Sequence, residues 1–497
     1  MSGNDGYYGS GGGRSGGGSA DAPFERRLLL GAFLFHPGGG HVTGWRHPTA
    51  DAEGHLDIDF FKRFAQTAER GVFDTIFLAD GLYLWDRFPS GTDHYSQVRP
   101  EPLTLLSALA VHARHIGLAA TISTTYNEPY HVARALATLD HLSRGRAAWN
   151  LVTSRYDEEA RNFGGDSHLD HSRRYERGAE FVEVVEALWD SWADDAFVAD
   201  KESGVFADAA KLRTTNHQGE FFTVRGPLNV ARGPQGYPVQ FQAGGSPAGQ
   251  ELAAATADAV FARLLPLEAS QQFYAGLKER VAAHGRDPER FAILPGIRPV
   301  VATTRAEAED IAEELLASTP DALILEDVSH SIGQDLTGLT ADDPFIHAPD
   351  VDVSNESKSP GRIHDALLGA GPVTAREIYA KAFREHTLIG TATEIADEIE
   401  ERFTSRAADG FIVQGLTQPD SLERFVDLVT PELQRRGLTR TEYRDETLRE
   451  RFGLDRPVRR ASASDAPAAV SAPPGVADAA ATASGTASLP AATSVSA

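Results

Sequence analysis

The sequence predicts an α/β fold, a TIM (β/α)8 barrel enlarged by insertions. Short apolar runs rich in β-branched residues alternate with helical patterns, as expected of βα units around a parallel sheet. About eight strand–helix pairs occur between the two ends of the chain, the number that closes such a barrel. A plain barrel needs only about 250 residues, so the segment 24–458 leaves room for additional chain.

Each predicted strand is a short apolar run that ends on polar or glycine residues. The expected strands are Leu28–Phe35, Thr75–Asp80, Gly117–Ser123, Ala147–Thr153, Val239–Gly244, Ala259–Arg263, Ile293–Ala302 and Gly410–Gly415. Helical patterns follow in nearly every gap: Asp57–Arg70, Leu103–Ala113, Pro129–Leu142, His171–Trp192, Pro247–Ala257, Leu267–His284, Arg305–Ala317 and Asp420–Leu433. Helices between consecutive parallel strands are the crossovers that a barrel requires.

The remaining chain forms tails and insertions. Residues 1–23 are rich in Gly and Ser, and residues 459–497 are reduced to Ala, Ser, Pro, Thr, Val and Gly, so we expect two disordered tails. Insertions are expected at about 194–232, between strands four and five, and at about 319–393, between the seventh helix and the last strand. Long loops after barrel strands build substrate pockets, so both are candidate lids or pocket walls.

The composition excludes several classes of function. The 497 residues hold 71 Asp and Glu against 47 Lys and Arg, a formal charge of −24 that disfavours nucleic acid as a partner. No run of about 18 apolar residues and no signal peptide occurs, which predicts a soluble, cytoplasmic protein without a membrane partner. Cysteine is absent, which excludes disulfides, thiolate nucleophiles and Cys-ligated metals.

A barrel carries its active site at the carboxyl ends of its strands. The residues found there are polar or small: His36 and Gly38–His41, Ala79 and Asp80, Ser123–Tyr126, Asn150–Ser154, and Gly244–Ser246. Donors and acceptors on the ends of apolar strands suit a ring of contacts around a bound cofactor. Asp80 has no obvious cation nearby in the sequence, so it is either a ligand acceptor or a loop cap. Trp45, Tyr83 and Trp85 add aromatic surface near the same rim, typical of a pocket for a flat or apolar ligand.

One strand end has the pattern of an anion site. Gly244-Gly245-Ser246 leads into a helix that starts at Pro247, so free N–H groups and a helix dipole would face a phosphate. The alternative is a plain N-cap serine. Arg174 and Tyr175 open the fourth helix and could reach the same anion, although on this stretch alone a solvated basic face is the favoured interpretation.

Other chemistries lack their motifs. His168 and His171 lie beside a helix start and are expected to cap it, so no metal site is indicated. No Walker A run, Rossmann fingerprint or nucleophile elbow occurs. Arg213, Arg225 and Arg232 would suit an acidic substrate, but on loops such residues are more often solvated.

The stretch GLAATISTTYNEPYHVARALATLDHLSRGRAAWNLVTS, Gly117 to Ser154, resembles the signature of the bacterial-luciferase-like flavin monooxygenases. It is most similar to the subfamily of nitrilotriacetate monooxygenase, dibenzothiophene-sulfone monooxygenase and pristinamycin synthase. Further matching stretches are Phe73–Asp80, Arg161–Trp192, Asn216–Gly236 and Val239–Phe261, and the likeness spans roughly Arg27 to Gly437.

The resemblance implies a two-component FMN-dependent monooxygenase. Such an enzyme receives FMNH2 from a separate NAD(P)H:flavin oxidoreductase and reacts it with O2. The resulting C4a-(hydro)peroxyflavin oxidises a small organic substrate. The chain itself would bind no nicotinamide, which agrees with the missing Rossmann fingerprint, and relatives are usually homodimers or homotetramers.

The resemblance also implies a set of site residues. Phe33, Ala79 and Asp80 would flank the isoalloxazine ring, and Asn150, Val152 and Ser154 would lie along it. Arg174, Tyr175, Gly245 and Ser246 would hold the phosphate, while His41 and Trp85 could meet the peroxide or the substrate.

Two other functions remain open on the sequence alone. A deazaflavin-dependent oxidoreductase of the same fold would transfer hydride without oxygen. A non-catalytic flavin-binding protein would bind oxidised FMN tightly and show no reductase-dependent turnover.

Overall fold

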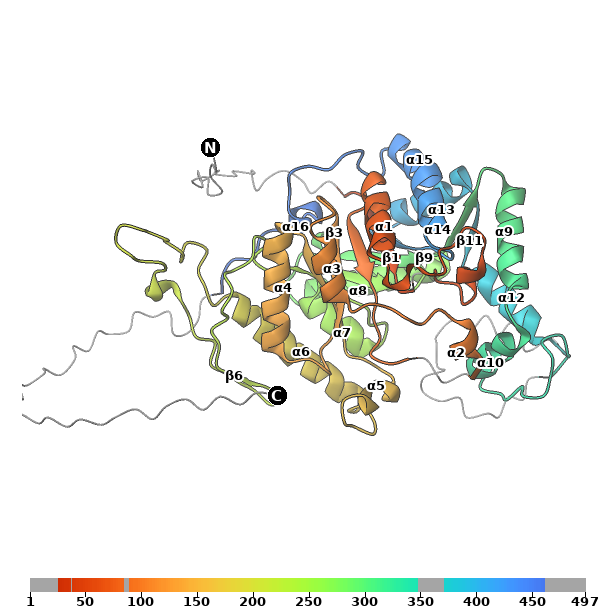
Figure 1. Ribbon diagram of the computed structural model, residues 1–497, viewed down its shortest axis with the longest axis horizontal. Helices are drawn as coiled ribbons and strands as arrows, with labels where there is room; N and C mark the ends of the chain where they lie inside the picture. The colour runs from red at the N-terminus through yellow and green to blue at the C-terminus, as the bar shows by residue number, and fades with distance from the viewer. Residues whose placement is uncertain (1–25, 37, 85–88, 347–370, 461–497) are drawn as a thin grey trace, which may run out of the picture. The chain divides into compact units, whose positions relative to one another are not determined.

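The computed structural model describes residues 26–36, 38–84, 89–346 and 371–460 (Figure 1). Eight parallel strands close a barrel in the order β1-β12-β9-β8-β7-β4-β3-β2, which confirms the predicted TIM barrel. The strands are β1 (Leu29–Leu34), β2 (Thr75–Leu78), β3 (Gly117–Ser123), β4 (Ala147–Val152), β7 (Val239–Gln242), β8 (Ala259–Ala262), β9 (Ala292–Ile297) and β12 (Gly410–Gln414). The expected tail 1–23 lies outside the described residues, as does the expected tail 459–497 apart from its first two residues.

Alternation along the strands divides the core into an inner and an outer part, since successive side chains point to opposite faces. One cluster takes every second residue of the strands and fills the barrel: Leu29, Phe77, Ala119, Ala148, Val239, Phe241, Ala259, Leu294 and Ile412, with Phe33 and Phe261 packed against it. The intervening residues, among them Leu30, Ile76 and Trp149, pack outward against the helices.

Helices cover the outside of the barrel, and several of them begin at a side-chain cap. They are α1 (Ile58–Arg70), α3 (Pro102–Leu109), α4 (Pro129–Ser143), α6 (His171–Trp189), α7 (Pro247–Thr256), α8 (Leu267–Ala283), α13 (Ala392–Thr404), and α14 (Asp420–Arg424), which continues through a π-helical turn (Phe425–Val429) into α15 (Thr430–Arg435). Short helices are α2 (Pro89–His94), α5 (Asp157–Arg161) and α16 (Leu448–Arg451). Helix α1 illustrates the pattern: the Asp57 carboxylate accepts the Asp59 N–H at its start, and Phe60, Phe61 and Phe64 are buried.

The prediction of a single strand from Ile293 to Ala302 is wrong. The barrel strand β9 ends at Ile297, and β10 (Pro299–Ala302) pairs instead with β11 (Leu388–Thr391) in a separate two-stranded sheet. Arg298 stands at the break, and Pro299 has no N–H to donate to a continuing ladder. An unbroken apolar run conceals this change of sheet.

The second insertion therefore begins earlier than expected. Helix α9 (Arg305–Ala317), expected as the seventh barrel helix, packs on β10 and β11, while α13 lies between β9 and β12 in the chain and packs into the barrel's outer core. Helices α10 (Asp321–Ile332) and α12 (Ala375–Glu385) pack against each other in a small apolar cluster of their own.

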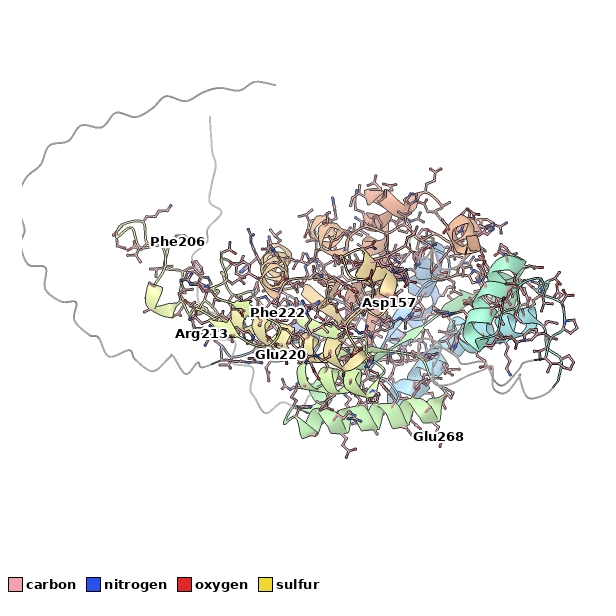
Figure 2. All side chains as sticks on the ribbon, turned by 90° about the horizontal axis from the view of Figure 1, so that it is seen from below. Asp157, Phe206, Arg213, Glu220, Phe222 and Glu268 are labelled. Atoms are coloured by element: carbon pink, nitrogen blue, oxygen red, sulfur yellow. The ribbon has the colours of Figure 1, made fainter. Side chains whose placement is uncertain are left out.

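The first insertion carries a short antiparallel pair, β5 (His217–Gln218) and β6 (Thr223–Val224), and a projecting loop. In this loop the Val198 N–H donates to the Phe206 carbonyl at 3.0 Å, and the Phe197 and Phe206 rings lie 5.7 Å apart. Phe206 is nevertheless 69% exposed. Figure 2 shows Phe206 on a loop that stands away from the barrel helices.

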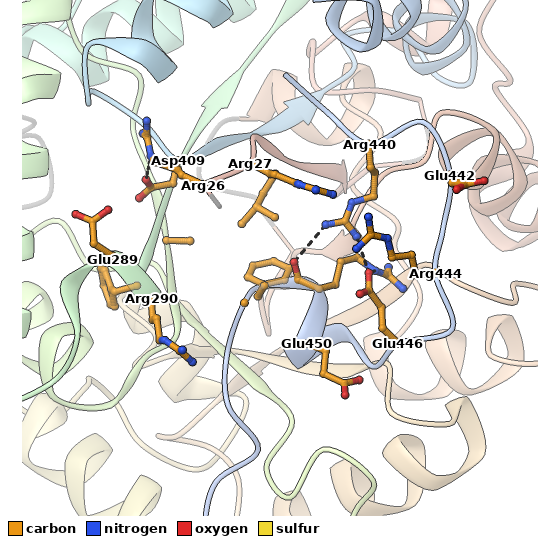
Figure 3. A pocket seen from close by; sticks show the side chains of 16 residues that line it. Arg26, Arg27, Glu289, Arg290, Asp409, Arg440, Glu442, Arg444, Glu446 and Glu450 are labelled. Carbon is orange, nitrogen blue, oxygen red and sulfur yellow. Dashed lines mark hydrogen bonds and ion pairs between the residues drawn. The ribbon is translucent and has the colours of Figure 1, made fainter. Parts of the chain in front are cut away.

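A cavity of about 240 Å³ lies at the amino end of the barrel, where β1, β9 and β12 begin (Figure 3). Several of its charged side chains form ion pairs: Arg26 Nε lies 2.9 Å from Asp409 Oδ1, and Arg440 Nη1 lies 3.0 Å from Glu446 Oε1. Barrel enzymes react at the opposite end, so we assign these charges to stability.

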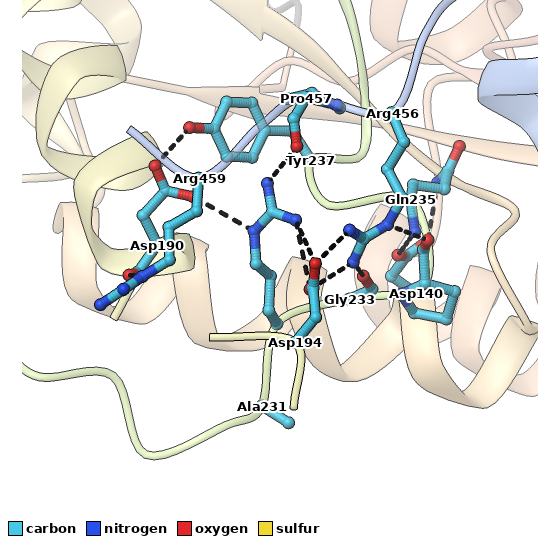
Figure 4. Close-up of polar contacts among 12 residues, drawn as sticks. Asp140, Asp190, Asp194, Ala231, Gly233, Gln235, Tyr237, Arg456, Pro457 and Arg459 are labelled. Atoms are coloured by element: carbon cyan, nitrogen blue, oxygen red, sulfur yellow. Dashed lines mark hydrogen bonds and ion pairs between the residues drawn. The ribbon is translucent and has the colours of Figure 1, made fainter. Parts of the chain in front are cut away.

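The chain following α16 ties the first insertion to α6 (Figure 4). Arg456 forms two hydrogen bonds of 2.6 Å with the Asp194 carboxylate. Arg232, whose side chain is 1% exposed, lies 3.2 Å from Asp190 and donates to the Pro457 carbonyl at 2.6 Å. The sequence offered two roles for Arg232, a contact for an acidic substrate or a solvated loop residue, and both are wrong. Arg232 is buried and forms an internal ion pair.

Candidate active site

The expected cofactor residues lie along one arc of the barrel rim, on the adjacent strands β1, β2, β3, β4 and β7 and the helices that follow two of them. Phe33 is on β1, Ala79 and Asp80 directly follow β2, and Asn150 and Val152 are on β4. Helix α6 brings Arg174 and Tyr175 to the same arc, and Gly245 and Ser246 connect β7 to α7. Trp85 lies outside the described residues.

Phe33 lies at the top of the apolar barrel interior. Its ring centroid is 6.1 Å from that of Phe77, in a stacked arrangement, and 5.7 Å from that of Phe261. Ala79 is half-buried and donates its N–H to the Leu34 carbonyl at 3.0 Å. A small residue beside a half-buried aromatic ring leaves a flat apolar surface that suits a flat ligand.

Asn150 carries a polar group that the protein itself does not satisfy. Its Nδ2 donates to Thr121 Oγ1 at 2.9 Å, but its buried Oδ1 has no hydrogen-bond partner among the described residues. An unsatisfied buried acceptor costs about 1–3 kcal/mol. A ligand that presents an N–H would remove this cost. Val152 follows two residues later on the same face of β4.

Asp80 has a cationic neighbour that the local sequence does not reveal. Arg99 Nε lies 3.8 Å from Asp80 Oδ1, and Arg99 also donates to the Tyr83 carbonyl at 2.9 Å and lies over the Phe35 ring. Burial raises the pKa of Asp80 to about 6, although Arg99 acts in the opposite direction. The carboxyl group can therefore hold or release a proton near neutral pH.

Ser154 adopts a backbone φ of +55°, a left-handed conformation that is uncommon outside glycine. Its hydroxyl lies 2.9 Å from Ser123 Oγ and donates to Glu159 Oε1 at 3.0 Å. Glu159 is buried and also accepts the N–H groups of Arg155 and Tyr156 at the start of α5. This carboxylate fixes the loop after β4, and such strained backbone is concentrated at functional sites.

The loop from β7 to α7 and the start of α6 form a candidate anion cradle. Ser246 caps α7 by accepting the Gly249 N–H at 3.1 Å, and its hydroxyl lies 3.5 Å from the Tyr175 hydroxyl. A Cβ on Gly244 would come within 2.7 Å of the Gly249 backbone, so this position requires glycine. Gly245 is exposed, with open space where a side chain would be.

Arg174 completes the cradle from α6. Its Nη1 donates to the Ser154 carbonyl, whereas its buried Nε has no partner among the described residues. The Arg174 side chain thus links the loop after β4 to α6, whose next residue, Tyr175, reaches α7. Free N–H groups at a helix start, a phenol and a guanidinium are the donors that a phosphate prefers.

His41 lies on another part of the rim. Its N–H donates to the Leu416 carbonyl beyond β12, its Nδ1 accepts the Thr43 N–H at 3.3 Å, and its Nε2 lies 3.5 Å from the Tyr379 hydroxyl of α12. Burial, with a contribution from Arg298, lowers the pKa of His41 to about 4. The imidazole is therefore neutral at physiological pH.

An open pocket of about 650 Å³ adjoins the arc beyond β3, between α4, α5 and α6. Tyr126 and His168 line it, with Tyr126 Oη 2.7 Å from His168 Nδ1. His168 Nε2 lies 3.9 Å from Glu159, the carboxylate that holds Ser154. The pocket thus shares a wall with the loop after β4.

A family model described as luciferase-like monooxygenase matches residues 39–409. The chain belongs to this family. The resemblance inferred from the sequence motifs is confirmed.

The luciferase-like chain is similar to named monooxygenases over most of its length. N-acetyl-S-(2-succino)cysteine monooxygenase of Bacillus subtilis (strain 168) is 45% identical over 440 residues, covering 88% of this chain and 98% of that protein. Nitrilotriacetate monooxygenase component A of Aminobacter aminovorans is 42% identical over 445 residues, covering 87% and 98%. The crystal structure of DmoA from Hyphomicrobium sulfonivorans matches with a TM-score of 0.76 at 31% identity, covering 86% and 92%.

His36 lies on the rim of this luciferase-like barrel, and the motifs assigned no role to it. It directly follows β1, and neither ring nitrogen has a hydrogen-bond partner among the described residues. Its ring lies 4.1 Å from Phe35 and 4.6 Å from Tyr95, and burial lowers its pKa to about 3. Its position directly after a predicted strand was the only indication in the sequence, because no other residue at a characteristic spacing forms a motif with it.

The described part of the chain contains no group of three His, Cys, Asp or Glu side chains arranged to hold a metal ion. His168 bonds to Tyr126 rather than capping α6. Among the described helices, none is both long and apolar enough to cross a bilayer.

Proposed function

We propose that this luciferase-like protein is the oxygenating component of a two-component FMN-dependent monooxygenase. It takes FMNH2 from a separate NAD(P)H:flavin oxidoreductase and uses O2 to oxidise a small organic substrate. The observation that carries the proposal is the pairing of an unsatisfied Asn150 Oδ1 inside the barrel with an anion cradle at the start of α7. These are complementary to the two ends of FMN, a ring with an N–H group and a phosphate.

The ring end of the proposed site is apolar with polar edges. Phe33 and Ala79 would cover the isoalloxazine ring, while Asn150, Val152 and Ser154 would lie along β4 and the loop that follows. Asn150 Oδ1 would accept a ring N–H, since it is buried and otherwise unpaired.

The phosphate end combines backbone and side-chain donors. Gly245 and Ser246 would present N–H groups at the start of α7, where the helix dipole favours negative charge. Tyr175 and the unpaired Nε of Arg174 would add two further donors.

Reduced FMN, when bound, supplies the electrons with which dioxygen is activated. The protein's own groups keep the site dry and control charge. Aromatic side chains exclude water, His36 and His41 remain neutral because burial lowers the pKa of each, and Asp80 holds or releases a proton near pH 6.

A separate reductase is proposed for two reasons. The sequence has no Rossmann fingerprint for a nicotinamide cofactor, and one close relative is itself named a component of its monooxygenase. Both reported sequence relatives are monooxygenases, which favours oxygenation over deazaflavin-dependent hydride transfer and over flavin binding alone.

We propose that the protein forms a homodimer or homotetramer through the loop of the first insertion. Phe206, Val198 and Val205 are exposed on it together, and Figure 2 places Phe206 away from the barrel. Exposed contiguous apolar side chains mark association surfaces.

An anaerobic titration tests the cofactor proposal. FMN and dithionite-reduced FMN are added to the purified protein, and binding is followed by quenching of the tryptophan fluorescence. We expect reduced FMN to bind more tightly than oxidised FMN, because the protein must capture the flavin that the reductase releases. Tight binding of oxidised FMN alone would favour the non-catalytic alternative, and binding of a deazaflavin without FMN would favour hydride transfer.

A further inference from the structure

Two arginines end adjacent barrel strands on the part of the rim opposite the proposed flavin arc. Arg263 directly follows β8 and Arg298 directly follows β9. The two strands are neighbours in the barrel, with Ala262 paired to Pro295. Because parallel strands end at the same edge, both side chains start from the face where barrel enzymes carry out their chemistry.

Arg298 is accessible and at the same time enclosed. Arg298 is exposed to solvent, yet desolvation by surrounding protein lowers the pKa of its guanidinium. Its Nε donates to Gln414 Oε1 at 3.2 Å, at the end of β12. A ligand can therefore reach Arg298 although protein atoms surround its guanidinium.

The surroundings of Arg298 come from the second insertion and the loop before α3. Its charge interacts with Tyr95, with Tyr379 of α12 and with Asp327 of α10. Burial raises the pKa of Tyr95 to about 12 and that of Tyr379 further, so both phenols remain neutral. Burial also raises the pKa of Asp327 to about 6, so this carboxyl group takes up a proton only below neutral pH.

Two buried arginines elsewhere in the described part of the chain pair with a carboxylate. Arg232 lies 3.2 Å from Asp190, and Arg449 lies 2.7 Å from Asp258. Within the described residues, neither Arg298 nor Arg263 forms an ion pair within 4.0 Å. An anionic ligand would offset the cost of desolvating the Arg298 guanidinium. The exposed Arg263 guanidinium, from the adjacent strand end, offers further donors to the same ligand.

We propose that Arg298 and Arg263 bind a carboxylate group of the organic substrate. A guanidinium offers two parallel N–H donors that match a carboxylate. The position opposite the flavin arc would orient an acidic substrate across the barrel mouth, facing the ring. The orientation of the substrate toward the flavin ring rests on the proposed function. The anion site itself depends only on the two arginines.

The test measures binding to the FMN-loaded protein without a reductant, so no turnover is needed. The probes are nitrilotriacetate and N-acetyl-S-(2-succino)cysteine, each compared with its trimethyl ester by calorimetry in metal-free buffer. The variants are Arg298→Gln, Arg298→Lys and Arg263→Gln. Arg435→Gln is the matched control, because Arg435 is exposed on α15 and paired with Glu432 at 2.6 Å.

We expect at least one acid to bind the unmodified protein at least tenfold more tightly than its ester. Arg298→Gln and Arg263→Gln should each weaken that acid about 10- to 100-fold, the effect of losing a hydrogen bond between charged groups. Arg298→Lys should retain part of the affinity, which separates loss of charge from misfolding. Affinity for the esters and for FMN should not change, and neither should any property of Arg435→Gln.

Two results would overturn the proposal. One is that the binding data show no role for the arginines: the unmodified protein prefers neither acid over its ester, or both glutamine variants bind the preferred acid normally. The other is that the variants lose FMN but retain riboflavin, which would assign the arginines to the cofactor phosphate. Failure of the proposed oxygenation would be seen in a separate experiment, in which reduced FMN reacts with oxygen equally fast with and without the protein. That result would not change the affinities measured for the acids.

Discussion

Gly245→Asp is expected to weaken FMN binding without harming the fold. A side chain at this position meets no atom within 4 Å, and Gly245 is exposed immediately before the cap of α7. An aspartate near a helix start is also favourable for the helix. The substitution should therefore reduce only the affinity of the cradle for a negatively charged ligand.

The magnitude follows from Coulomb's law. Two unit charges 4 Å apart interact by about 1 kcal/mol in water and about 4 kcal/mol at the dielectric typical of a protein surface. Gly245 is at the edge of the cradle, and a phosphate monoester carries nearly two charges. We therefore expect a loss of about 2–4 kcal/mol, or about 30- to 800-fold in the dissociation constant.

The assay compares FMN with riboflavin, which lacks the phosphate, by flavin fluorescence titration. Riboflavin affinity should be unchanged in Gly245→Asp. Gly276→Asp on α8 is the control, because its side chain also meets no atom within 4 Å and adds the same charge. Equal losses for FMN and riboflavin, or no loss for either, would refute the assignment of the cradle to the phosphate.

Four further predictions concern the cradle, the pH dependence, the core and the assembly. Tyr175→Phe removes a hydroxyl 3.5 Å from the Ser246 hydroxyl and should weaken FMN about tenfold with riboflavin unaffected; equal affinities in variant and parent would contradict this. The raised pKa of Asp80 means that the folded state holds its proton more tightly than the unfolded chain. The free energy of unfolding should therefore fall as pH rises from about 4 to about 6, by up to about 3 kcal/mol, and urea denaturation of Asp80→Asn should show a flatter profile. Arg232→Met removes the nearer of the two arginines beside the buried Asp190 carboxylate and leaves Arg213 at 3.9 Å; it should lower the free energy of unfolding by about 3 kcal/mol, and a change below about 1 kcal/mol would be inconsistent with this role. Phe206→Asp should reduce the molar mass measured by light scattering, and an unchanged mass would exclude this loop from the interface.

The barrel was predictable because its signals are local. Each of the eight strands combines a short apolar run with a polar end, and the helices between them begin at caps such as Asp57 and Ser246. The break at Arg298 was not predictable, because strand propensity continues across it and only pairing with β11, far along the chain, reveals the second sheet.

The cradle and the arc were also accessible from the sequence, since Arg174, Tyr175 and Gly245 lie in motifs. The ion-pair partners of Asp80 and Asp190 could not be predicted from the sequence. Arg99 reaches Asp80 from a loop beyond α2, and Arg232 finds Asp190 across an insertion. Such contacts depend on tertiary packing, which no short spacing encodes.

The central claim, that this protein reacts bound reduced FMN with oxygen, is tested most directly by stopped-flow absorbance. The protein is mixed anaerobically with FMNH2 and then exposed to oxygenated buffer. We predict a transient species with an absorbance band distinct from those of reduced and oxidised FMN, which decays more slowly than free FMNH2 oxidises in buffer. Direct conversion to oxidised FMN at the buffer rate, with binding demonstrated under the same conditions, would contradict the account.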